Sequence, residues 1–277
     1  MSAPDAPLPR YEIPLLTIVR LVRDALVGRP RSFARDARAV LDSNPYPRTI
    51  VGPEHVVADR PFIIVMNHFN RPGLRPYHCA MVVSSALAER RADGPEVGWA
   101  FTSEYRDRKV GPIPIPPAVF RWVFSRCAHI YGLIPIPRQE MLVANRAAAL
   151  RQLARRLAVG PIGLTPEGLL ASDTLVEPPP GNGRFLQLIA GGVVPLLPVA
   201  AWEDGSALTV RFGEPFHLSP AAGLSREEQD RRASDRVMIA IGALMPRRYW
   251  GAYAARIAAS GEPRACRARV NAGVGQA

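Results

Sequence analysis

The chain has 277 residues, 48% of them hydrophobic, which is enough apolar sequence for one large domain with its own core. The formal net charge is +11, the sequence pI is near 10.5, and Lys109 is the only lysine, so arginine carries almost all of the positive charge. This charge favours an anionic partner, either a nucleic acid or an anionic membrane face, but no RNA-binding, zinc-finger or helix-turn-helix pattern supports a nucleic acid.

Residues 1–45 are predicted to form an amphipathic helical hairpin. The first helix spans residues 13–28, and the second starts at Ser32 as N-cap and runs to about Leu41. Apolar residues share one face of the first helix at positions 15, 18, 19, 22 and 26. Two interpretations stay open: a helix pair that packs against the core, and an interfacial membrane anchor in which apolar burial and arginine attraction to anionic lipid add.

From about residue 48 the strand and helix patterns alternate along the chain. Strand or extended patterns cover 62–66, 96–101, 132–138, 160–168, 193–202 and 207–215, and helical patterns cover 74–91, 118–127, 138–157 and 225–245. This alternation predicts an α/β domain over residues 46–250, with a mixed sheet flanked by helices. The Ala-, Gly- and Arg-rich segment 251–277 is predicted to be a flexible tail.

Cysteine and histidine spacing gives no indication of a metal centre. Cys79, Cys127 and Cys266 lie far apart without a CxxC pair, which predicts a reduced, cytoplasmic chain. The five histidines have no HxxxH spacing, so no metal is expected. We also expect no secretory signal, because the N-terminus carries acids and prolines, and no membrane span, because no run of about 20 apolar residues occurs.

A histidine stands directly after the apolar strand pattern of residues 62–66. In FIIVMNHFNRPGL, Asn67 and His68 lie where the apolar run gives way to a polar loop. Ligands bind α/β folds where strands end in loops, so His68 is a candidate site residue, with a hydrogen-bonded structural histidine as the alternative. An imidazole suits a general base, because its pKa lies near working pH.

Four blocks in order, over roughly residues 50–215, resemble the glycerol-3-phosphate and lysophosphatidate acyltransferase family. VMNHFNRPG resembles the family's Asn-His and the start of its H-x4-D box, and GLIPIPR resembles the G-x-I-x-I-x-R pattern that ends at Arg138. LTPEGLLAS resembles the F-P-E-G-T-R-S box and contributes Pro166, Glu167 and Gly168. VVPLLPVA resembles the family's V-P-V-x-P-V strand.

The resemblance implies a glycerolipid acyltransferase-like fold and acyl transfer. A fatty acyl group would pass from acyl-CoA or acyl carrier protein to a hydroxyl of a lysophospholipid or another lipid acceptor, without a cofactor. His68 would be the general base and Glu167 a second catalytic residue, and the expected substrate-binding residues are Asn67, Arg71, Arg138, Pro166 and Gly168. The expected location is cytoplasmic and peripheral to the inner face of the membrane, with no nucleic-acid partner.

The first block departs from the family pattern at Gly73, where the family has an Asp five positions after the histidine. That Asp would orient the imidazole and stabilise its charged form. Either the loop is reshaped and another group orients His68, or catalysis is weak, or the chain is not an enzyme. Glu167 is the nearest candidate to orient the ring, and Asn70 or a backbone carbonyl are the others. The alternative function is therefore a catalytically silent acyltransferase-like protein that binds lipid or acyl chains.

The third block departs at Leu169 and Leu170, which replace the family's Thr-Arg. The change removes an arginine expected to hold the acceptor phosphate, and it predicts a more apolar pocket suited to a different lipid alcohol. Arg71 and Arg75 are the two candidates for compensating that loss, and solvated surface arginines are the alternative for both.

Overall fold

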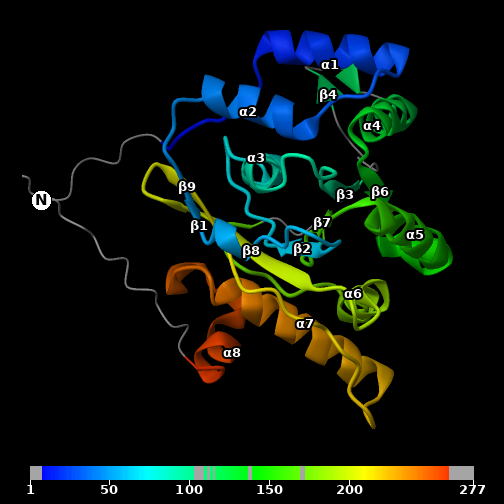
Figure 1. Ribbon diagram of the computed structural model, residues 1–277, viewed down its shortest axis with the longest axis vertical. Helices are drawn as coiled ribbons and strands as arrows, with labels where there is room; N and C mark the ends of the chain where they lie inside the picture. Colours follow the sequence, from blue (N-terminus) through cyan, green and yellow to red (C-terminus); the bar gives the residue numbers. More distant parts are fainter. Residues whose placement is uncertain are drawn as a thin grey trace, which may run out of the picture.

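One seven-stranded sheet lies at the centre of the structure, which is a computed structural model (Figure 1). It describes residues 8–102, 109–110, 113–114, 116–136, 139–168 and 172–261. The strands of the sheet are β1 (Arg48–Val51), β2 (Ile63–Met66), β3 (Gly98–Thr102), β6 (Ile134–Ile136), β7 (Ile162–Leu164), β8 (Leu196–Asp204) and β9 (Ala207–Phe212). A separate two-stranded pair consists of β4 (Lys109–Val110) and β5 (Ile113–Pro114).

The strand order β1-β9-β8-β2-β7-β3-β6 makes the sheet mixed, as the sequence predicts. From β8 to β6 all neighbours are parallel, whereas β9 runs antiparallel to β8 and parallel to β1. β2 lies between β7 and β8, and all four of its residues are fully buried, which explains why its sequence is a continuous apolar run. The carboxyl ends of β2, β7 and β8 therefore meet at one edge of the sheet.

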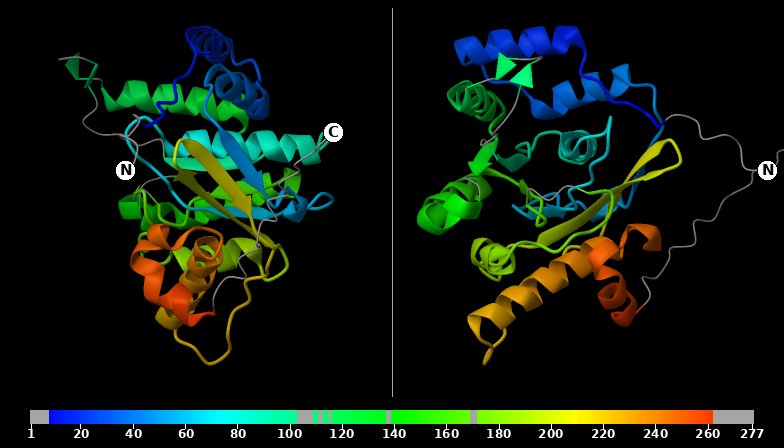
Figure 2. Two further views of the ribbon diagram at one scale, coloured as in Figure 1. Left: turned by 90° about the vertical axis from the view of Figure 1, so that its left-hand side faces the viewer. Right: turned by 180° about the vertical axis from the view of Figure 1, so that it is seen from behind.

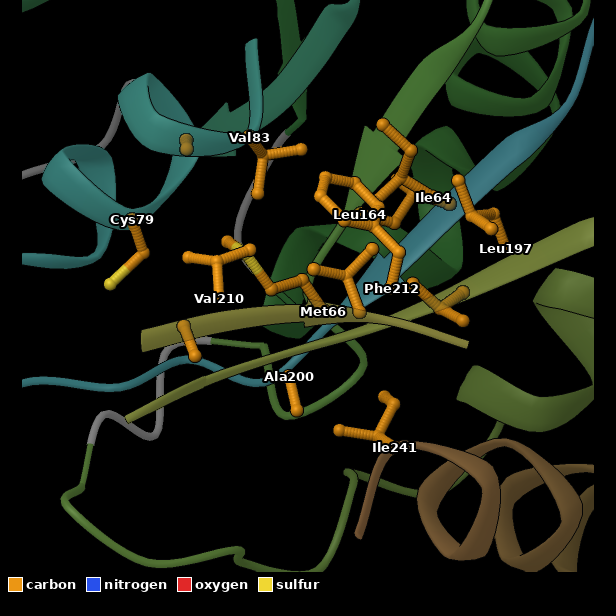
Figure 3. Close-up of a cluster of buried hydrophobic side chains, with 14 of the residues drawn as sticks. Ile64, Met66, Cys79, Val83, Leu164, Leu197, Ala200, Val210, Phe212 and Ile241 are labelled. Carbon is orange, nitrogen blue, oxygen red and sulfur yellow. The ribbon is translucent and has the colours of Figure 1, made fainter. Parts of the chain in front are cut away.

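Helices cover both faces of this sheet. They are α1 (Leu15–Val27), α2 (Phe33–Ser43), α3 (Pro76–Arg90), α4 (Pro117–Tyr131), α5 (Gln139–Val159), α6 (Asn182–Ala190), α7 (Arg226–Gly242) and α8 (Ala254–Ala259), with 3₁₀ turns at Pro53–His55, Arg247–Tyr249 and Gly251–Tyr253. α3 lies on one face, with α2 and then α1 outside it, and α6, α7 and α8 lie on the other (Figures 1 and 2). Figure 3 shows Val83 of α3 and Ile241 of α7 on opposite sides of the sheet. The α/β sandwich predicted from the sequence is confirmed.

The two N-terminal helices turn their apolar faces in different directions. α2 begins at its predicted N-cap, where the Ser32 hydroxyl accepts the Arg35 backbone N–H at 2.9 Å. Its apolar face is buried, including Ala37 and Val40. The core-packing interpretation of the hairpin is therefore correct for α2.

α1 instead exposes its apolar residues. Leu15 is 75% exposed and Val27 is 72% exposed. The buried residues of this helix are Asp24 and Ala25, and the Asp24 carboxylate forms ion pairs with Arg23 and Arg31. The exposed large apolar residues of α1 are Leu15, Leu16, Ile18, Val19, Val22, Leu26 and Val27. Arg31, which precedes α2, thus ties the carboxyl end of α1 to the body, and the core-packing interpretation is wrong for the apolar face of α1.

The sequence patterns missed two helices near the end of the chain. α6 has only nine residues, and its first backbone N–H groups are bound by a distant side chain: Asp230 of α7 accepts from Gly181 at 2.6 Å and from Arg184 at 2.9 Å. The predicted flexible tail begins too early, because residues 251–259 form a 3₁₀ turn and α8 that bury Tyr253 and Ile257. None of the helices among the described residues has the length and apolar character needed to cross a bilayer.

The contact between α6 and α7 predicts the cost of adding one methyl group. A Cβ at Gly183 would lie 2.1 Å from the Asp230 carbonyl oxygen and 2.6 Å from the Ser234 nitrogen, so Gly183→Ala must push the helices apart. We expect this change to lower the free energy of unfolding by about 2–3 kcal/mol, measured by urea denaturation. Leu188→Ala, at a site that is 56% exposed on the same helix, is the matched control and should change it by less than about 0.5 kcal/mol. Equal midpoints for the two variants would contradict this account.

Candidate active site

The loops that follow β2 and β7 meet at the carboxyl edge of the sheet. His68 stands two residues after the last residue of β2, and Glu167 stands three residues after the last residue of β7. The backbone N–H of His68 donates to Oε2 of Glu167, so the first and third sequence blocks are in direct contact although 99 positions separate them. His68 is half-buried at this edge. The two predicted catalytic residues therefore lie side by side.

The Glu167 carboxylate is buried and holds main chain on both of its oxygens. Only 2% of the residue is exposed, and its second oxygen accepts the Val176 N–H at 2.9 Å. Burial raises the pKa of Glu167 to about 7, and the hydrogen bonds from the His68 and Val176 N–H groups act in the opposite direction. The sequence named Glu167 as the nearest candidate to orient the His68 ring. The hydrogen bond between the two residues is made by the His68 backbone N–H. Glu167 thereby fixes where the main chain of His68 lies.

Asn67 holds the same strand end from the other side. Its Nδ2 donates to the Ala201 carbonyl at 2.8 Å, and its Oδ1 accepts the Ala201 N–H at 2.7 Å. This pair of bonds extends the β2–β8 ladder by one step beyond Met66. Both polar groups of the Asn67 side chain thus bind β8, and these bonds fix the position of the residue before His68.

Arg71 belongs to a buried ion pair rather than to an open cationic site. It is 8% exposed, Glu203 at the end of β8 is 6% exposed, and both Nε and Nη2 of Arg71 donate to the two oxygens of that carboxylate. Its Nη1 also donates to the Pro72 carbonyl at 2.5 Å. The expected substrate contact of Arg71 stays a prediction, and it would carry a cost, because moving the guanidinium to a phosphate would leave Glu203 buried and unpaired.

The loop geometry explains why residue 73 is a glycine. Gly73 has φ +85°, a left-handed conformation that side chains rarely adopt. A Cβ there would lie 3.0 Å from Arg10 Cγ and 3.0 Å from Arg71 Nη1. An Asp at this position would be strained and crowded, so the loop in this conformation favours a glycine.

The third block ends in a tight turn that reaches α6. Gly168 has φ +69°, and its N–H donates to the Thr165 carbonyl at 3.0 Å. The carbonyl of Pro166 accepts from Asn182 Nδ2 at 2.7 Å, at the start of α6. Pro166 and Gly168 thus shape the turn that presents Glu167. Arg138 and the Leu169–Leu170 pair, also named by the sequence blocks, lie outside the described residues.

Sequence reasoning missed three partners that complete this edge. Ser172 pairs with the loop after β2, because its carbonyl accepts the Asn70 N–H at 3.0 Å. Glu203 and the Val176 amide are the other two. Glu203 could have been predicted, because its carboxylate stands at the end of the apolar run PVAAWED. The Val176 amide could not, because every residue except proline has a backbone N–H.

The resulting edge can perform acid–base chemistry. The backbone of a histidine is bound here to a buried carboxyl group whose pKa is raised toward neutrality. Over the part of the chain that the structure describes, no cluster of three or more His, Cys, Asp or Glu residues is arranged to hold a metal ion. The first amides of α6 bind Asp230, so this helix end is occupied and does not offer itself to a substrate phosphate.

The raised pKa of Glu167 predicts how stability depends on pH. The pKa rises from an ordinary value of 4.5 to about 7 on folding, so the folded chain binds this proton more tightly. The associated stabilisation is fully present below pH 4.5 and is lost as the pH rises through about 7. We expect the free energy of unfolding of the wild type, relative to Glu167→Gln, to fall by about 2–3 kcal/mol between pH 5 and pH 8. The exposed Glu54→Gln is the control, and parallel curves for wild type and Glu167→Gln would refute the prediction.

Comparison with known proteins gives a limited result. No protein-family model matches the chain, and no curated protein matches it. Three solved chains match its fold, among them the crystal structure of the 1-acyl-sn-glycerophosphate (LPA) acyltransferase, PlsC, from Thermotoga maritima. That match has 20% sequence identity and a TM-score of 0.43, and it covers 74% of this chain and 75% of that chain. A likeness of this extent carries no conclusion about function.

Proposed function

We propose that the protein is an acyltransferase that moves a fatty acyl group from acyl-CoA or acyl carrier protein to a hydroxyl of a lysophospholipid or other lipid acceptor. The single observation that carries this proposal is the direct contact between His68 and Glu167 at the carboxyl edge of the sheet. These residues come from two of the four blocks that resemble the glycerolipid acyltransferase family, and the same edge is where α/β folds bind ligands.

His68 acts as the general base in this proposal. The imidazole takes the proton of the acceptor hydroxyl, whose oxygen then attacks the thioester carbonyl. The C–S bond breaks, the carrier thiolate leaves, and the imidazolium returns the proton to it. Because the nucleophile is the acceptor itself, no covalent enzyme intermediate is needed.

Glu167 serves this chemistry as a positioning residue, since the contact that supports its role is the one to the His68 backbone. Asn67 acts on the same strand end through Ala201. Arg138 remains our proposed contact for an acceptor phosphate, on the strength of its block alone. Arg71 is the weaker choice for that contact, because its guanidinium is already bound to Glu203.

We also propose that the outer face of α1 rests on an anionic membrane surface. Seven of its large apolar residues are exposed, and Arg20 and Arg23 add cationic groups to the same helix. α4 lies next to α1 and exposes Trp122 and Val123, with the Arg126 guanidinium over the Trp122 ring. Exposed apolar residues mixed with arginine fit the interface of an anionic bilayer, and a membrane would present the lipid acceptor to the enzyme.

The second candidate function is a catalytically silent protein that binds lipid or acyl chains. Gly73 favours it, because a glycine without a side chain stands where the family has the carboxylate that would orient a catalytic imidazole. This candidate requires saturable acyl-CoA or lipid binding without turnover.

Acyl transfer is tested by thiol release from acyl-CoA, and from an acyl carrier protein donor, with a panel of lysophospholipids and other lipid alcohols. His68→Ala should lower acceptor-dependent release by about 100-fold or more, because a general base contributes at least this factor. Its melting temperature should stay near that of the wild type. His217→Ala removes an exposed histidine and should behave like wild type. Release that persists in His68→Ala would refute the mechanism, and binding without release in the wild type would favour the silent protein.

Membrane contact is tested by sedimentation with vesicles that contain phosphatidylglycerol. Val19→Asp replaces a 55% exposed apolar residue of α1 and should weaken binding at least tenfold, because it loses apolar burial and adds a negative charge. Leu188→Asp makes the same change at a 56% exposed site on α6 and should bind as wild type does. Equal binding of the two variants would overturn the assignment of α1 to the membrane.

A further inference from the structure

The segment just before α1 lies against the loop that follows His68. We call residues 10–12 the strap. The backbone N–H of Tyr11 donates to the Gly73 carbonyl at 2.8 Å. Gly73 also packs against Arg10, since a Cβ on that glycine would lie 3.2 Å from Arg10 Cα. The strap thus fills the space beside the residue that replaces the family's Asp.

The strap is itself fixed to the body of the protein. Asn44, at the carboxyl end of α2, accepts the Glu12 N–H on Oδ1 at 2.9 Å and donates from Nδ2 to the Glu12 carbonyl at 2.8 Å. Asn44 is 7% exposed, and Nδ2 also donates to the Val40 carbonyl at 2.7 Å. These bonds tie the strap to α2, so it does not rest on the loop alone.

The Tyr11 ring provides a second attachment, at the far end of the loop. Tyr11 is 6% exposed, and its ring centroid lies 5.2 Å from that of Tyr46 and 5.4 Å from that of His78. His78 is buried, and its Nδ1 accepts the Arg75 N–H at 3.0 Å, which fixes the start of α3. The strap therefore contacts both the turn at Gly73 and the residue that closes the loop.

The inner side of the loop is fixed to the sheet. Arg71 and Leu74 exchange two backbone hydrogen bonds of 3.0 Å each, which makes the turn around Gly73 a closed unit, and the Arg71 side chain ties this unit to Glu203. His68 lies three positions before Arg71. Only Phe69 and Asn70 stand between His68 and this closed turn, so the position of the turn limits where the chain that leaves His68 can lie.

From these contacts we infer that the strap is a positioning element for His68: through Gly73 and His78 it holds the loop of residues 67–75 from outside. The catalytic part of this inference rests on the proposed acyl transfer. The structural part, that the strap determines the order of the loop, does not.

The structural part is tested by amide hydrogen exchange in the full chain. Tyr11→Ala removes the ring from its place between Tyr46 and His78, and Asn44→Ala removes the two bonds to Glu12 from a site on α2. Each should raise the exchange rates of the Asn70, Arg71 and Leu74 amides at least tenfold, while the amides of β8 keep wild-type rates. Tyr11→Phe keeps the ring and the backbone bond and should restore slow exchange. Loop rates that stay at the wild-type level in both alanine variants, with β8 intact, would overturn the inference.

The catalytic part is tested on the same variants by steady-state acyl transfer. Tyr11→Ala should lower kcat at least tenfold with the KM for the acyl donor changed less than twofold, because the strap is argued to act on His68 and not on the donor. Tyr11→Phe should recover kcat. Faster loop exchange with unchanged kcat would mean that the strap orders the loop without positioning His68, and would overturn that part. A wild type without any transfer would refute the proposed function, while the exchange data would still decide whether the strap holds the loop.

Discussion

A buried carboxylate connects the ends of two parallel strands, and the arrangement of the candidate site depends on it. Glu167 is reached by backbone N–H groups of His68 and Val176, which come from different loops. A carboxylate with so little exposure to water is unfavourable unless donors satisfy it, and buried backbone donors are unfavourable without an acceptor. Each part therefore stabilises the other, and the main chain of His68 is placed by a group that belongs to another strand.

The unequal lengths of neighbouring strands supply the rest of this support. β2 ends after four residues, whereas β8 runs for nine and continues past it. The extra length of β8 offers Ala201 to the side chain of Asn67 and Glu203 to Arg71. The loop after β2 is thus polar in sequence, yet several of its polar groups are bound to the sheet. The longer strand β8 offers them the hydrogen-bond partners that water would otherwise provide.

The features that depend on local sequence pattern could be predicted from the sequence. Apolar periodicity located β2 and the helices that flank the sheet, and the blocks brought His68 and Glu167 to one edge. It failed where the decisive partner is remote: α6 is capped by Asp230 from α7, and Arg71 is bound by Glu203, 132 positions away. Whether the apolar face of a helix points to the core or to the outside is also decided by the whole fold. For this reason α1 and α2 have similar sequence patterns, but only α2 buries its apolar face.

The absence of a side chain at Gly73 has a consequence for how such chains diversify. Arg10 and Tyr11 lie against the turn at Gly73, and they belong to none of the four blocks. If the strap positions His68 as we propose, selection on the site also acts on this segment outside the blocks, and the segment and the loop after β2 must change together to remain compatible. Two relatives with identical blocks and different residues before α1 would then have different sites, so a family tree built from the blocks alone would not separate them.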